Sequence, residues 1–114
     1  MNPMLLAYIL LALAIISEVT GSTFLVKSEG FTQLVPSLLV FIFYVISFYL
    51  LSQVLKTIPL GIAYAIWSGV GIVLTALIGF FIFRQGLDFP AVIGIAMIIG
   101  GVIVMNVFSK SVGH

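Results

Sequence analysis

The chain has 114 residues, of which 63% are hydrophobic and 6% are charged, and its formal net charge is +1. A soluble domain usually carries about 25% charged residues, so this composition excludes a soluble globular domain and indicates an integral membrane protein. The small net charge argues against a nucleic-acid or polyanionic partner, and the absence of cysteine excludes a disulfide framework and a thiolate metal site.

Apolar stretches at 4–25, 34–55, 58–83 and 89–108 follow one another along the chain. Each contains the roughly 20 apolar residues that a membrane-spanning helix needs. The connectors between them are short, so consecutive helices must run antiparallel. We therefore expect an all-α membrane protein with one domain over residues 1–114 and four transmembrane helices per chain. Little of the chain remains to form an enzyme site, so we expect no enzymatic activity.

The first stretch contains Glu18, the one charged side chain inside any of the apolar stretches. A carboxylate at the centre of a membrane helix costs about 2.5–3.5 kcal/mol by insertion scales, so such a residue is a functional-site hypothesis for protons or a cation. Ala14, Gly21 and Ser22 lie on the same helical face and leave room beside the acid. Taken alone, Ala14 and Gly21 are better explained as a helix-packing surface; Glu18 favours a binding site.

The second and third stretches contain aromatic residues that are well suited to a hydrophobic cation. Tyr44 and Trp67 lie well inside their stretches, and Tyr64 is one helical turn before Trp67. Tyrosine and tryptophan more often mark the membrane interface. Next to a carboxylate, however, these rings would form an aromatic cage in which cation–π attraction contributes about 2 kcal/mol or more.

Small residues follow in the third and fourth stretches. The run Gly69-Val70-Gly71 weakens its helix and permits a hinge, although close packing is the more common role of such glycines. In the fourth stretch, small residues recur at spacings of four and seven, which favours a helix-association surface: Gly94, Ala96, Gly100 and Gly101. Asp88 precedes this stretch and is a suitable N-cap.

The basic residues predict no preferred orientation in the membrane. Lys27 and Arg84 fall on one side of four antiparallel helices, and Lys56, Lys110 and the N-terminal amine fall on the other. An excess of basic residues on one side normally sets the orientation of a membrane protein. Because neither side has a clear excess here, both insertions should be populated, and a copy can pair with an inverted copy. With so few charges, the alternative is that the count carries no information.

Several motifs together resemble the small multidrug resistance transporters. They are residues 14–19 followed by Gly21, the loop Ser28-Glu29-Gly30-Phe31-Thr32, and the long run from Gly61 to Gly71. The Ser28-Glu29-Gly30-Phe31 loop and the run Trp67-Ser68-Gly69-Val70-Gly71 are similar to the branch that exports quaternary ammonium compounds. The guanidinium-exporting branch usually has a tryptophan shortly after its glutamate, and this chain has none there.

The resemblance implies a multi-pass antiporter of the bacterial inner membrane that works as an antiparallel homodimer. The first three helices would line the binding chamber, and the fourth would hold the dimer together. Glu18 would take the proton and the substrate, and the segment 69–71 would bend during alternating access. The resemblance also implies substrate-contacting positions, namely Tyr44, Tyr64, Trp67, Ala14, Gly21 and Ser22; at the last of these, threonine is common in the family.

We therefore expect a proton-coupled antiporter that exports lipophilic and quaternary ammonium cations, with no cofactor and no metal. The runner-up is a guanidinium or polyamine exporter that uses the same acid. A proton-translocating rotor subunit is disfavoured by the number of apolar stretches, and a purely structural membrane protein would have no need for Glu18 to titrate.

Overall fold

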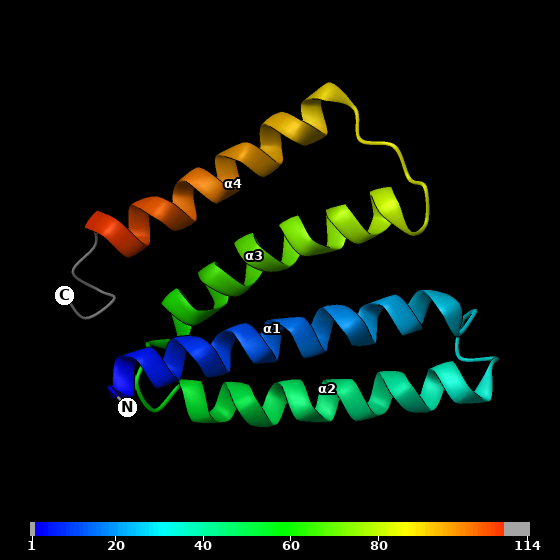
Figure 1. Ribbon diagram of the computed structural model, residues 1–114, viewed down its shortest axis with the longest axis horizontal. Helices are drawn as coiled ribbons and strands as arrows, with labels where there is room; N and C mark the ends of the chain where they lie inside the picture. Colours follow the sequence, from blue (N-terminus) through cyan, green and yellow to red (C-terminus); the bar gives the residue numbers. More distant parts are fainter. Residues whose placement is uncertain (1, 109–114) are drawn as a thin grey trace. The chain divides into compact units, whose positions relative to one another are not determined.

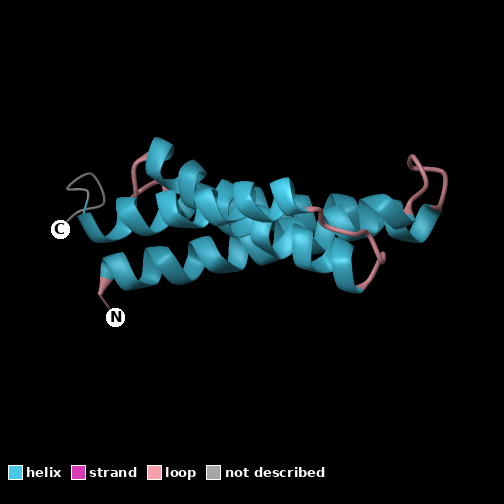
Figure 2. Ribbon diagram, turned by 90° about the horizontal axis from the view of Figure 1, so that it is seen from above, coloured by secondary structure: helices cyan, strands magenta, loops and turns pink. Residues whose placement is uncertain are grey.

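The computed structural model describes residues 2–108, which fold into four α-helices joined by loops: α1 Pro3–Lys27, α2 Leu34–Val54, α3 Leu60–Phe81 and α4 Phe89–Phe108 (Figures 1 and 2). The helices contain 20 to 25 residues. At 1.5 Å per residue they are about 30–37 Å long, which matches the roughly 30 Å hydrocarbon core of a bilayer. The expectation of an all-α chain whose four helices are long and apolar enough to cross a membrane is confirmed. Lys110, used above for orientation, lies outside the described residues, as does the N-terminal amine.

The helix ends differ from the apolar stretches by up to two residues. Lys27 belongs to the last turn of α1, where its charge complements the negative end of the helix dipole. Helix α3 begins at Leu60, two residues later than its apolar stretch, because Pro59 is its N-cap and a residue before proline is disfavoured in a helix. Helix α3 ends at Phe81, two residues early, because Arg84 adopts a left-handed conformation with φ of 55°.

The chain divides into two compact units, Met1–Thr57 and Ile58–His114. The expectation that residues 1–114 form a single domain therefore stays a prediction. In the first unit, α1 and α2 lie side by side and antiparallel (Figure 1). The rings of Phe24 and Phe43 stack between them with centroids 6.0 Å apart.

The loop between α1 and α2 is organised by the buried Ser28. Its hydroxyl donates to the Leu25 carbonyl (2.7 Å) and accepts from the Phe31 backbone N–H (3.1 Å). Three consecutive residues, Glu29, Gly30 and Phe31, have positive φ angles between 50° and 72°. Only the glycine adopts this conformation without a steric cost, so the hydrogen bonds of Ser28 hold a strained turn that joins the two helices.

The second unit contains α3 and α4, which contact each other much less extensively than α1 and α2 do. They come close together at Gly69, where an added Cβ would collide with the side chain of Val102. Asp88 accepts a hydrogen bond from the Ala91 backbone N–H (3.0 Å), so its predicted role as the N-cap of α4 is confirmed.

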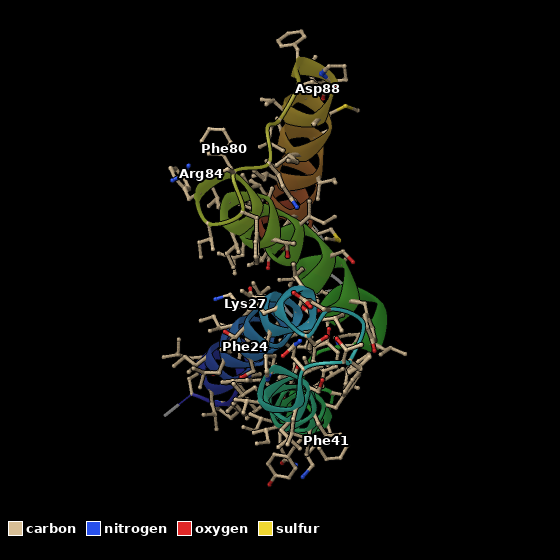
Figure 3. All side chains as sticks on the ribbon, turned by 90° about the vertical axis from the view of Figure 1, so that its right-hand side faces the viewer. Phe24, Lys27, Phe41, Phe80, Arg84 and Asp88 are labelled. Atoms are coloured by element: carbon tan, nitrogen blue, oxygen red, sulfur yellow. The ribbon has the colours of Figure 1, made fainter. Side chains whose placement is uncertain are left out.

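Apolar side chains cover these helices on all sides rather than on one face (Figure 3). Phe41, for example, points away from α1 and is 71% exposed. No residue of α4 is buried. Helices that are apolar all round are typical of a membrane interior, where lipid or another protein covers the surface.

Candidate cation and proton site

Glu18 lies in the middle of α1 and is the one acidic side chain in the four described helices. Its side chain is half-buried. The Ser22 hydroxyl, one helical turn further along, donates a hydrogen bond to Glu18 Oε1 at 3.2 Å. The carboxylate is therefore held in place by its own helix and is still accessible to a ligand.

Tyr44 of α2 extends this contact across the two helices. Its hydroxyl lies 2.9 Å from Ser22 Oγ, so Glu18, Ser22 and Tyr44 form one hydrogen-bonded chain. The sequence places Glu18 and Ser22 on one face of a helix, but no local pattern connects them with Tyr44, 22 residues further on. The structure thus brings together three of the predicted site residues.

Gly21 makes this arrangement possible because it lets the Tyr44 ring approach α1. A Cβ at position 21 would lie 2.8 Å from two ring carbons of Tyr44, which is inside normal contact distance. Ala14 is fully buried, and its carbonyl accepts a hydrogen bond from the buried Ser47 hydroxyl of α2 (2.9 Å). In this chain both small residues lie at the α1–α2 contact; a contact with substrate stays a prediction for them.

Ser47 is a positioning residue that the sequence alone did not single out. A helical serine commonly bonds a backbone carbonyl of its own helix. Ser47 instead donates across the hairpin, one turn before Glu18. A hydroxyl in an otherwise apolar stretch is the signal that could have identified it.

Tyr64 and Trp67 lie in the second unit, on α3. Their rings stack with centroids 6.2 Å apart and an interplanar angle of 29°. Tyr64 is 45% exposed, so this aromatic pair has a free surface. Since Glu18 and Tyr44 belong to the other unit, a shared aromatic cage stays a prediction.

The segment Gly69-Val70-Gly71 is continuous α-helix within α3. Gly69 is required for the close contact with Val102, whereas a Cβ at Gly71 would make an ordinary contact of 3.7 Å with the Trp67 ring. The structure therefore gives Gly69 a packing role, and the hinge stays a prediction.

Within the described part of the second unit, the small residues of α4 make no close contact that their size would explain. A Cβ added at Gly94, Gly100 or Gly101 would meet nothing within 4 Å, and Ala96 is exposed. A partner outside the chain would explain their size. Among residues 2–108, no group of three or more His, Cys, Asp or Glu side chains could hold a metal ion.

Residues 6–98 match the family model described as Small Multidrug Resistance protein. Over its full length the chain is 53% identical to the whole of the multidrug transporter EmrE of Escherichia coli K12. It is 46% identical, over 94% of its length, to 97% of the quaternary ammonium compound-resistance protein QacE of Escherichia coli. It is also 48% identical, over 90% of its length, to 98% of the multidrug resistance protein EbrA of Bacillus atrophaeus. The resemblance inferred from the motifs is confirmed: this multi-pass membrane protein belongs to the small multidrug resistance family.

Proposed function

We propose that this chain is a proton-coupled antiporter that exports lipophilic and quaternary ammonium cations across the bacterial inner membrane. The observation that carries the proposal is Glu18: one half-buried carboxylate, hydrogen-bonded by Ser22, in helices that contain no other acid. Family membership and the names of the bacterial relatives support the transport activity and the substrate class.

A single carboxylate can couple two ions because it holds one of them at a time. The ionised Glu18 attracts a cation, and a proton that binds the same oxygen atoms removes that attraction. If the site opens to one side of the membrane at a time, protons moving inward drive cations outward. The stacked Tyr64–Trp67 pair, of which Tyr64 is exposed, would supply cation–π attraction and apolar contact. Because few directed hydrogen bonds restrict these contacts, selectivity should be loose.

An antiparallel homodimer completes the proposal. In this arrangement two Glu18 side chains, one from each copy, face a shared chamber. The open space around Gly94, Gly100 and Gly101 supports α4 as the helix that contacts the second copy. The balanced basic residues support insertion in both orientations.

Transport in proteoliposomes tests the proposal directly. With an imposed proton gradient, the wild type is expected to move methyl viologen and tetraphenylphosphonium, and to release protons when it binds the latter. Glu18→Gln keeps the shape of the side chain and removes the charge, so coupled transport and proton release should both disappear. Glu29→Gln is the matched control, because Glu29 lies in an exposed loop and should leave transport intact.

Two results would contradict the proposal. Proton-driven export by the Glu18→Gln variant would exclude Glu18 as the coupling site. A response limited to guanidinium or polyamines across the same substrate panel would assign the chain to the alternative substrate class.

A further inference from the structure

The hydrogen-bonded chain Tyr44–Ser22–Glu18 has a direction that is set by the charge of the acid. An ionised carboxylate only accepts hydrogen bonds, so Ser22 must donate its one hydroxyl proton to Glu18 Oε1. With that proton committed, the 2.9 Å contact with Tyr44 requires the tyrosine hydroxyl to be the donor. The proton order is therefore Tyr44 to Ser22 to Glu18.

We propose that Ser22 is a positioning residue for the site. Its hydroxyl stabilises the ionised form of Glu18, and through it the protonation of this acid determines whether Tyr44 donates or accepts a hydrogen bond. The inference rests on the proposed function, because it assumes that Glu18 exchanges a proton for a cation. It assigns to Ser22 a role through the carboxylate, in addition to any contact with the substrate.

The two helices are fixed to each other on both sides of Glu18. Ser47 donates to the Ala14 carbonyl (2.9 Å), four residues before the acid, and the Ser22–Tyr44 contact lies four residues after it. In an α-helix that same carbonyl accepts the backbone N–H of Glu18. The backbone beneath Glu18 is thus held by α2, and the remaining freedom of the side chain is limited by Ser22.

Few other groups compete for this role. Helix α2 contains no charged residue, and its titratable groups are Tyr44 and the 64%-exposed Tyr49. On α1, Tyr8 and Lys27 are ten and nine residues from Glu18, which corresponds to about 15 and 14 Å along the helix. Of the described residues of α1 and α2, Ser22 and Tyr44 are the ones whose hydroxyl groups are connected to the carboxylate by hydrogen bonds.

Protonation of Glu18 changes the direction of both hydrogen bonds, from Tyr44 to Ser22 and from Ser22 to Glu18. A neutral carboxyl group can donate to Ser22, which can then donate to Tyr44, so the order of the protons reverses. Tyr44 also lines a groove of about 450 Å³ on α2, together with Phe31, Val40, Phe41, Val45 and Phe48. The charge of Glu18 is thereby connected with the surface of the opposite helix.

The test is the pH dependence of tetraphenylphosphonium binding to the purified full-length protein. Removal of the hydroxyl in Ser22→Ala should let protons displace the cation more easily. The pH at which binding is half-maximal, called the midpoint below, should rise by about one unit. This is a tenfold change in the proton concentration needed to displace the cation, or about 1.4 kcal/mol. Ser22→Thr retains a hydroxyl and should restore the midpoint to within about 0.3 unit. Thr23→Val is the matched control, because the Thr23 hydroxyl donates to the Val19 carbonyl of its own helix.

A double variant tests whether the residues act in series. Tyr44→Phe keeps the ring and removes the donor to Ser22, so we expect a smaller shift in the same direction. If Tyr44 acts through Ser22, the variant with both changes should have the same midpoint as Ser22→Ala. Additive shifts would refute the inference that Tyr44 acts on Glu18 through Ser22. A Ser22→Ala midpoint equal to that of the wild type would refute the positioning role of Ser22.

Proton release separates this inference from the proposed function. If the wild type binds tetraphenylphosphonium without releasing protons, the antiport proposal fails. If the wild type releases protons but Ser22→Ala leaves the midpoint unchanged, only the role of Ser22 fails. Circular dichroism of each variant checks the helix content, and Tyr44→Phe, which should also raise the midpoint, provides the readout should Ser22→Ala lose its helices.

Discussion

Gly21→Ala should separate α1 from α2 at the site. The new Cβ would lie 2.8 Å from two ring carbons of Tyr44 and 3.3 Å from Phe43 Cβ. To reach an ordinary carbon–carbon contact of about 3.5 Å, the ring has to retreat by about 0.7 Å. If the tyrosine hydroxyl moves with the ring, its 2.9 Å contact with Ser22 lengthens to about 3.6 Å and ceases to be a hydrogen bond.

The energy of this change follows from three terms. Overpacking costs about 1–3 kcal/mol, and the lost hydrogen bond costs about 0.5–1.5 kcal/mol. Alanine regains about 1 kcal/mol through its better helix propensity. The net loss in the free energy of unfolding should therefore be about 0.5–3.5 kcal/mol.

Unfolding by sodium dodecyl sulfate from mild detergent micelles, followed by circular dichroism, measures this loss. Gly61→Ala is the control, because its Cβ would meet nothing within 4 Å and should not lower the stability. Gly21→Ala should also weaken tetraphenylphosphonium binding. Equal stability of the two variants, with unchanged binding, would refute the close contact between Gly21 and Tyr44.

Three further changes test other parts of the molecule. Trp67→Leu should weaken tetraphenylphosphonium binding about tenfold or more by isothermal titration calorimetry, whereas Trp67→Phe should retain most of the affinity; equal values for both would remove the aromatic role. Gly100→Leu should reduce energy transfer between labelled copies in liposomes while leaving the helix content unchanged, and undiminished transfer would exclude this face of α4 as the dimer contact. Asp88→Ala should remove about 1 kcal/mol of N-cap stabilisation and speed hydrogen exchange at Ala91, whereas Asp88→Asn should preserve the protection; equal exchange would argue against the cap.

Hydropathy predicted the number and the approximate positions of the helices because membrane helices must be long and apolar. It could not predict their ends, which depend on backbone hydrogen bonds rather than on polarity. Ile82 and Phe83 are as apolar as the helix before them, yet α3 ends at Phe81, ahead of the left-handed Arg84. Asp88 was predictable as a cap because N-capping is a local effect that a short sequence specifies.

The candidate site was only partly predictable, for a similar reason. The spacing of Glu18 and Ser22 determines that they share a helical face. The contact of Ser22 with Tyr44 depends on how closely two helices approach, and this distance is set by the absence of a side chain at Gly21. Ser47 was not predicted as a positioning residue, because its acceptor belongs to a different helix from its own.

Helix α4 has no buried residue, so most of its side chains can be replaced without disturbing the interior of the chain. Its packing inside the chain includes the contacts of Ile98 and Val102 with Gly69. In a saturation mutagenesis scan of α4 under drug selection, few substitutions should therefore fail because they disturb packing inside the chain. Apart from Ile98 and Val102, the positions that do not tolerate substitution would identify the surface of α4 that another molecule contacts in the living cell.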